Sequence, residues 1–281
     1  MITLCIQVYN RLELLKKCLH SVSELRGLES TKLSLFVQKG NKQVEKYIFD
    51  NLDFFDTITY IAKESDIAAE NILFNRNLAY QVAFGSKECE LVIFFEEDVE
   101  VARDLIEFSI EINNIYKSDK NFHGINYGSV LKHNSINTYS ILRYGMHGPA
   151  SAISRQAWEK YTRSRHKMYG YKHFDGIIEY VLKTGFMVTP NRSLYFDNGL
   201  SGSHTGNDDI GFLKQLRESF RIDIENPGSG YEVCQMDANW RYPAKEYKRH
   251  LNIFYKLIHF MAQRHFTKSM AQKLVHFSNY P

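Results

Sequence analysis

The sequence predicts an α/β protein with a Rossmann-like, mostly parallel central sheet flanked by helices and a C-terminal helical extension. The first observation is that short apolar runs alternate with segments whose apolar residues have helical spacing. The second is that the run 91–95 is apolar at every position, as in a strand that helices cover on both faces. The third is composition: 281 residues, 44% hydrophobic, with only 5 prolines, can bury a large core.

The first half of the chain supplies the alternation. Leu12, Leu15, Leu19 and Val22 fall on one face of the predicted helix 12–25. Strands are expected at 2–9, 33–37, 57–62 and 91–95, and helices at 12–25, 43–52, 66–84 and 101–116. Such an order is typical of a doubly wound sheet, which binds its ligand beyond the carboxyl ends of the strands.

After about residue 120 the pattern changes to shorter elements separated by glycine-containing turns. Strands are expected at 122–127 and 138–144, and short helices near 154–163 and 174–184. We therefore expect one domain over 1–240 that consists of two halves, 1–120 and 121–240. Trp158 has helical spacing with Ile153 and Tyr161, which favours a place in the core.

The tail, 241–281, differs from the body in charge. It carries eight Lys and Arg residues against one acid, Glu246, although the net charge of the chain is only +3. Its apolar residues have helical spacing, so an amphipathic basic helix or helix pair is expected. Two interpretations stay open: peripheral contact of 245–277 with an anionic membrane, or an apolar face that packs on the domain. No nucleic-acid recognition motif is present, and the acidic body would repel phosphate.

The cysteines and the apolar segments indicate in which cellular compartment the protein is expected. Cys5, Cys18, Cys89 and Cys234 are far apart and form no C-x-x-C pair, which argues against a zinc site or disulfide framework. No window approaches the ~20 apolar residues of a membrane span, and the N-terminus reads as a strand rather than a signal peptide. A cytoplasmic protein, with peripheral attachment to the inner face of the membrane as the alternative, is expected.

Three consecutive carboxylates, Glu96, Glu97 and Asp98, follow the predicted strand 91–95. Crowded carboxylates repel one another unless a positive group lies between them. Oxygen ligands suit Mg2+ or Mn2+, which bridge carboxylates to phosphates. The alternative is an acidic first turn of the helix starting near Val101, where the helix dipole favours negative charge.

The segment EEDVEVARDL, 96–105, resembles EDDLEVAPDF of N-acetylglucosaminyltransferase I and its relatives, which are inverting glycosyltransferases of the GT-A fold. The resemblance aligns Asp98 with the last Asp of that family's DXD motif, which meets the metal ion held by the diphosphate of the donor. It implies that Glu96 and Glu97 also lie in the donor site.

Two more segments of the first half share the resemblance. VYNRLELLKKCLHSV begins with a turn that lies beside the nucleotide in many GT-A enzymes, and ENILFNRNLAYQVAF resembles their helix with an Arg-Asn pair. The implied donor-binding residues are Val8, Tyr9, Asn10, Arg11, Gln38 and Arg76. Lys39 stands where relatives often carry an Asp that binds uracil, so the sequence does not decide which nucleobase the donor carries.

The second half adds three segments in the same order as in the family. The resemblance thus makes 1–120 the nucleotide-sugar half and 121–240 the acceptor half of the domain. YGMHGPASAISRQAWEKY resembles a loop of the donor and acceptor pocket, here Gly145, His147 and Gly148. KHFDGIIEYVLKTG aligns Asp175 with the catalytic carboxylate, and GLSGSHTGND aligns His204 with a histidine near the diphosphate and metal. Outside the resemblance, Asp175 could be a helix N-cap and His204 an ordinary turn residue.

Together these segments imply a metal-dependent glycosyltransferase, acting with inversion, with Mn2+ or Mg2+ as cofactor. The expected donor is a nucleoside-diphosphate sugar, UDP-linked, and the expected acceptor is a saccharide or lipid-linked saccharide of a surface glycan. One alternative is an inactive nucleotide- or glycan-binding protein on the same scaffold. Another is a sugar nucleotidyltransferase, a class that usually has a glycine-rich loop after the first strand, whereas VYNRLELL contains no glycine.

Overall fold

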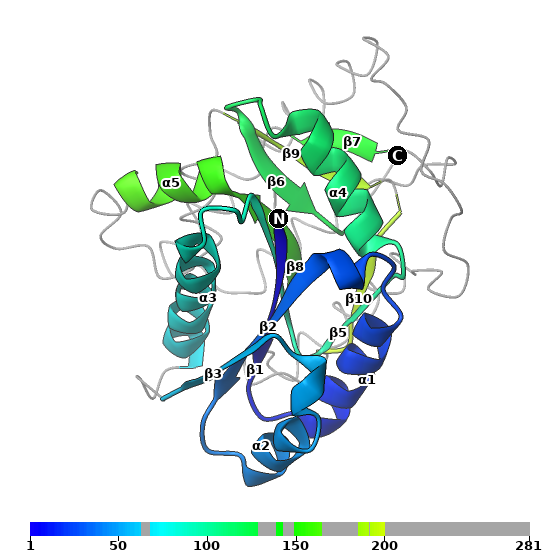
Figure 1. The fold of residues 1–281 in the computed structure, drawn as a ribbon, viewed down its shortest axis with the longest axis vertical. Coiled ribbons are helices and arrows are strands. Elements are labelled where there is room, and N and C mark those ends of the chain that lie inside the picture. Colours follow the sequence, from blue (N-terminus) through cyan, green and yellow to red (C-terminus); the bar gives the residue numbers. More distant parts are fainter. Residues whose placement is uncertain (63–67, 129–138, 143–148, 165–184, 191, 200–281) are drawn as a thin grey trace, which may run out of the picture. The chain divides into compact units, whose positions relative to one another are not determined.

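The computed structural model describes residues 1–62, 68–128, 139–142, 149–164, 185–190 and 192–199. All of them belong to one compact unit, Met1–Val233, in which strands and helices alternate (Figure 1). The predicted helix near 174–184 and the predicted tail, 241–281, lie outside the described residues. No helix in the described part is both long and apolar enough to cross a membrane.

The predicted alternation of the first half is confirmed, with element ends shifted by a few residues. The strands are β1 (Ile2–Val8), β2 (Thr31–Gln38), β3 (Thr57–Ile61) and β4 (Leu91–Glu96), and the helices are α1 (Leu12–Ser23), α2 (Lys42–Phe49) and α3 (Ala68–Gly85). Two 3₁₀ helices, Leu28–Ser30 and Leu52–Phe54, precede β2 and β3. Asn41 caps α2, because its side-chain oxygen accepts from the backbone N–H groups of Gln43 and Val44.

The helix predicted over 101–116 begins later than expected. Residues Val99–Val101 form a short strand, β5, and α4 spans Leu105–Tyr116 with Asp104 at its N-cap position. The alternative that placed the three carboxylates in the first turn of a helix near Val101 is therefore wrong. Val101 has the apolar character of a helix face, but its backbone is paired with a strand that comes much later in the sequence.

The second half contributes further strands to the same sheet. Its described elements are β6 (Phe122–Asn126), β7 (Tyr139–Leu142), β8 (Ala150–Ser154), α5 (Arg155–Ser164), β9 (Phe186–Pro190) and β10 (Tyr195–Asp197). The strands predicted at 122–127 and 138–144 and the helix near 154–163 are confirmed, whereas β8, β9 and β10 were not predicted.

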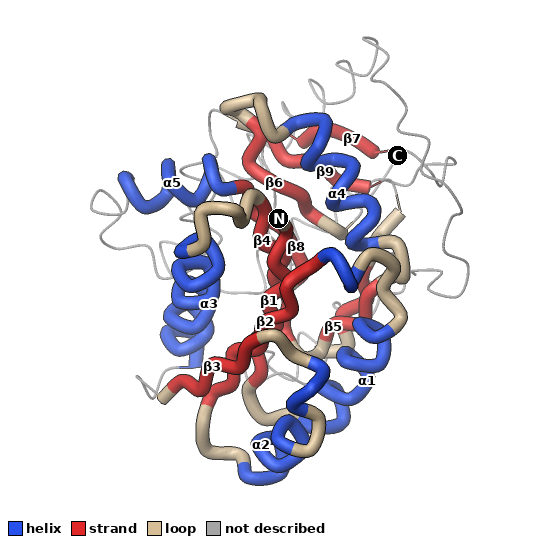
Figure 2. The backbone as a smooth tube through the Cα atoms, viewed as in Figure 1, coloured by secondary structure: helices blue, strands red, loops and turns tan. Residues whose placement is uncertain are grey.

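The described strands form one large sheet and one small one. The large sheet, whose strands are among the red segments of Figure 2, has the order β3-β2-β1-β4-β8-β6-β9-β7. Only β8 and β7 run against the direction of the other strands. The prediction of a mostly parallel sheet is thus confirmed. The small sheet pairs β10 with β5 in antiparallel register, so that Asp197 stands opposite Val99.

Helices cover both faces of the large sheet. α1, α2 and α4 lie on one side and α3 and α5 on the other (Figure 1), and each side has its own hydrophobic cluster. Ile93 and Phe95 of β4 enter the first cluster, and Val92 and Phe94 enter the second. β4 is buried on both faces as predicted, which explains its unbroken apolar run. Trp158 packs with the second cluster, as expected.

Candidate active site

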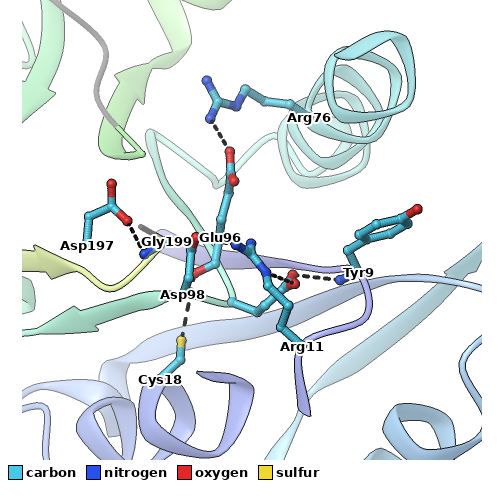
Figure 3. A network of polar contacts seen from close by, with 9 residues as sticks. Tyr9, Arg11, Cys18, Arg76, Glu96, Asp98, Asp197 and Gly199 are labelled. Atoms are coloured by element: carbon cyan, nitrogen blue, oxygen red, sulfur yellow. Dashed lines mark hydrogen bonds and ion pairs between the residues drawn. The ribbon is translucent and has the colours of Figure 1, made fainter. Parts of the chain in front are cut away.

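The candidate site lies at the edge of the sheet where β1 and β4 end. These strands are adjacent and parallel, with Gln7 in register with Glu96, so the turn after β1 and the turn after β4 meet (Figure 3). The chain brings Tyr9 and Arg11 from one turn against Glu97 and Asp98 from the other. This is the edge at which open α/β sheets bind ligands.

Arg11 bonds two consecutive carboxylates. Its Nε donates to Glu97 Oε1 at 2.9 Å, and its Nη1 lies 2.7 Å from Asp98 Oδ2. The backbone N–H of Tyr9 donates to Glu97 Oε2 at 2.6 Å, so both oxygens of Glu97 are bonded. Burial alone would lower the pKa of Arg11, but Glu97 and Asp98 raise it. The guanidinium therefore stays charged and fastens the two turns together.

Arg76, on α3, bonds the third carboxylate. Its Nη2 lies 3.3 Å from Glu96 Oε1, and its guanidinium lies over the Phe94 ring at 4.6 Å from the centroid. Burial raises the pKa of Glu96, Arg76 offsets part of this rise, and the neighbouring Asp98 and Glu97 add to it, so that the pKa is about 7. Two arginines are thus the positive groups that let three carboxylates stand together.

The face of the sheet toward α3 becomes polar at this edge. Glu96 and Gln7 are in register on neighbouring strands, and Asn71, Asn75 and Arg76 are buried on α3. Burying so many polar groups is costly unless they are hydrogen-bonded to one another or to a ligand. Among these groups, Gln7 Oε1 and Asn75 Nδ2 have no hydrogen-bond partner in the described part of the chain, which favours a polar ligand at this edge.

Asp98 is also held from its other side, by the residues that follow β10. The backbone N–H of Asn198 donates to the Asp98 carbonyl oxygen at 2.8 Å, and the Asn198 side chain donates to Glu100 Oε1 at 2.7 Å. The backbone N–H of Gly199 donates to Asp197 Oδ1 at 2.7 Å. Asp98 thus lies between Arg11 and the Asp197–Gly199 turn (Figure 3).

The Asp98 carboxylate retains an unused oxygen. Its side chain is 7% exposed, and among the described residues Oδ1 has no hydrogen-bond partner. A buried carboxylate oxygen without a partner is energetically costly, and coordination of a divalent cation by that oxygen would remove the cost. Within the same part of the chain, no three His, Cys, Asp or Glu side chains are grouped as metal ligands. Asp98 fits the role of one protein ligand in a site completed by other oxygens.

The other residues implied by the resemblance have different surroundings. Val8 is buried in the first hydrophobic cluster, whereas Tyr9 and Asn10 are exposed at the turn. Gln38 is buried at the end of β2, on the same edge as the carboxylates. The remaining predicted residues, Gly145, His147, Gly148, Asp175 and His204, lie outside the described residues.

Asp197 and Asn198 were not singled out from the sequence. The Asp-Asn-Gly run at 197–199 is a turn signal, but nothing local indicates that the turn reaches Asp98. The contact depends on the pairing of β10 with β5. The same holds for Arg192, which forms a buried ion pair with Asp104 at the start of α4.

The fold has counterparts among solved structures, although no family model and no curated protein matches the chain. Residues 1–349 of TarS from S. aureus superpose with a TM-score of 0.51 at 10% identity, covering 92% of this chain and 80% of that one. Its complex with UDP-GlcNAc gives 0.50 at 11% identity, covering 89% and 72%.

A third counterpart is the mannosyltransferase PcManGT from Pyrobaculum calidifontis in complex with GDP-Man and Mn2+. Its TM-score is 0.50 at 11% identity, and the match covers 98% of this chain and 84% of that one. The expected fold class is therefore confirmed: the chain has the GT-A fold of nucleotide-sugar glycosyltransferases. Likeness at this level of identity concerns the fold, and function has to be argued from the site.

Proposed function

We propose that the chain is a metal-dependent glycosyltransferase that moves a sugar from a nucleoside-diphosphate sugar to a saccharide acceptor. The observation that carries the proposal is Asp98, a buried carboxylate with an unpartnered oxygen at the ligand-binding edge of a GT-A sheet. Glycosyltransferases with this fold include one solved with UDP-GlcNAc and one solved with GDP-Man and Mn2+.

We place the donor site at the turns after β1 and β4, which Arg11 joins. Arg11 and Arg76 neutralise two of the three carboxylates, which leaves one negative charge when all three are ionised. Asp98 would hold Mn2+ or Mg2+, with His204 as the second protein ligand that the resemblance implies. The cation, when bound, offsets the negative charge that develops on the departing diphosphate. The exposed Tyr9 and Asn10 beside this point are available to the nucleotide.

The reaction also needs a general base in the acceptor half, 121–240. The resemblance assigns that role to Asp175, which would take the proton of the acceptor hydroxyl as the hydroxyl attacks the anomeric carbon. A single displacement, in which the deprotonated hydroxyl attacks on the face opposite the departing nucleoside diphosphate, inverts the anomeric configuration. The acceptor we propose is a saccharide of a surface glycan, and the donor is UDP-linked.

The proposal is tested by incubating the protein with UDP- and GDP-sugars, saccharide acceptors and Mn2+, and following release of nucleoside diphosphate. Turnover that stops with EDTA and resumes with Mn2+ is expected, with a product whose anomeric configuration, read by NMR, is opposite to that of the donor. Release of pyrophosphate from a nucleoside triphosphate and a sugar phosphate would identify a nucleotidyltransferase instead. Nucleotide binding without any turnover would identify the inactive binding protein.

A further inference from the structure

Asp197 is the last residue of β10 and lies beside the candidate metal site, although the proposed function assigns no role to it. β10 pairs with β5 so that Asp197 stands opposite Val99, the residue that follows Asp98. Just beyond it, the backbone N–H of Asn198 donates to the Asp98 carbonyl oxygen. The Asn198 amide donates in turn to Glu100, so the two turns are fastened on both sides of Asp98.

Gly199 shows how closely the two aspartates approach. A Cβ placed on Gly199 would overlap Asp98 Oδ2 and would lie 2.9 Å from Asp197 Oδ1. Asp98 Oδ2, the oxygen that also contacts Arg11, and Asp197 Oδ1 are therefore next to the same point, and only a residue without a side chain fits between them. The N–H of Gly199 donates to Asp197 Oδ1, which fixes the orientation of that carboxylate.

Two carboxylates this close are unfavourable unless a positive group lies with them. Arg11 supplies one contact, to Asp98 Oδ2, but it also bonds Glu97. Asp98 Oδ1 is buried without a hydrogen-bond partner in the described part of the chain. Mg2+ and Mn2+ are commonly held by one or two carboxylates together with phosphate oxygens of the substrate. The pair of aspartates and the unsatisfied oxygen match that donor set.

We propose that Asp197 is a second carboxylate ligand of the divalent cation, acting together with Asp98. The inference rests on the proposed function, because the diphosphate of the donor would supply the other oxygens. It also adds a role for Gly199, which keeps the space between the two carboxylates free of a side chain.

The competing role for Asp197 is a local one, in which its carboxylate serves contacts within the protein, among them the hydrogen bond from the Gly199 N–H. Two substitutions separate the roles. Asp197→Asn keeps an oxygen that can accept this hydrogen bond but removes the charge, whereas Asp197→Ala removes both. A ligand role predicts that the two variants lose cation affinity alike. A local role predicts that only Asp197→Ala is affected. Asp53→Asn, at an exposed carboxylate of the Leu52–Phe54 helix, is the control.

The measurement is Mn2+ binding to the full chain by electron paramagnetic resonance of free Mn2+, with and without UDP or GDP. For wild type and Asp53→Asn we expect Mn2+ binding that is strengthened by the nucleotide. For Asp197→Asn we expect the dissociation constant to rise about tenfold or more, because one charged ligand is lost. Unchanged thermal unfolding of Asp197→Asn would show that the loss is not due to misfolding.

Wild-type Mn2+ affinity in Asp197→Asn overturns the inference and leaves the proposed function in place. Failure of wild-type protein to bind Mn2+ with either nucleotide also overturns it. In that case nucleotide binding, measured by calorimetry in the same buffer, decides whether the proposed function fails as well.

Discussion

The Arg11 guanidinium, which is partly exposed, donates to a Glu97 carboxylate that is almost closed to solvent. Nε lies 2.9 Å from Oε1, and the Glu97 side chain is only 1% exposed. Burial raises the pKa of Glu97, while the charge of Arg11, its hydrogen bond and the Tyr9 N–H lower it. This contact joins the turn after β1 to the acidic turn after β4. It therefore stabilises the sheet edge and fixes the geometry of the candidate site.

Replacing Arg11 should destabilise the protein strongly. In Arg11→Met, Glu97 would stay buried with the Tyr9 N–H as its remaining hydrogen-bond donor, and removing one member of a buried pair typically costs about 3–5 kcal/mol. Urea unfolding should show this loss of unfolding free energy. The control is Lys16→Met, which breaks an exposed pair with Glu13 and should cost less than about 1 kcal/mol. Equal small losses in both variants would mean that the Arg11 contact does not hold the two turns.

Arg192 should couple the second half to the site. It pairs with Asp104, which is fully buried at the start of α4, and it precedes β10, which carries the Asp197–Gly199 turn. Arg192→Met should lower the unfolding free energy by about 3 kcal/mol and weaken Mn2+-dependent nucleotide binding, because Asp104 loses its ion-pair partner. Arg103→Met is the matched control, since the Arg103 pair with Glu24 is exposed. Similar effects of the two substitutions would contradict the coupling.

The buried His123 should make stability fall in acid. Burial, and then the nearby Lys160 ammonium, lower the pKa of His123 from 6.5 to about 4, whereas Asp119 raises it in part. Lys160 Nζ lies 3.2 Å from His123 Nε2. Between pH 6.5 and 4 the unfolded chain therefore binds a proton that the folded chain does not, so acidification favours unfolding. The expected loss across this window is on the order of 3 kcal/mol.

The pH dependence is checked by urea unfolding at several pH values between 4 and 7. His123→Gln should flatten the slope of unfolding free energy against pH, whatever its effect on absolute stability. His20→Gln, at an exposed histidine of α1, serves as the control. A wild-type slope in His123→Gln would assign the acid sensitivity to other groups.

Asp175→Asn tests the base that the resemblance implies. The variant is nearly isosteric but cannot accept a proton usefully, and general-base assistance is typically worth ~10²–10⁴-fold in rate. Turnover should fall at least about a hundredfold while donor affinity barely changes. Single-turnover kinetics together with calorimetry would separate the two quantities. Full activity of Asp175→Asn, or a product of retained configuration, would show that Asp175 is not the general base of an inverting transfer.

The sequence was informative wherever the signal is local. Apolar runs and helical spacing predicted β1 to β4 and the helices between them, because burial on one or two faces imposes a period that can be read along the chain. Glu96, Glu97 and Asp98 could be placed at the ligand edge for the same reason, since they directly follow the buried run 91–95, with Glu96 as the last residue of β4.

What the sequence did not predict depends on contacts between distant segments. The sequence predicts the start of a helix at Val101, the last residue of β5, because the partner strand, β10, is short and far along the chain. Arg11 and Arg76 were expected beside a donor, but their pairing with Glu97 and Glu96 becomes visible only when β1, β4 and α3 are brought together. The approach of Asp197 to Asp98 likewise depends on the pairing of two three-residue strands.

The central claim is that Asp98 serves a metal-dependent nucleotide-sugar site, and calorimetric titration with UDP and GDP in the presence of Mn2+ tests it most directly. Wild-type protein should bind at least one of the two nucleotides with one site per chain, and EDTA should abolish most of the binding. Asp98→Asn should weaken Mn2+-dependent binding about tenfold or more, whereas Asp53→Asn should bind as wild type does. Wild-type protein that binds neither nucleotide, or Asp98→Asn with undiminished EDTA-sensitive affinity, would contradict the account.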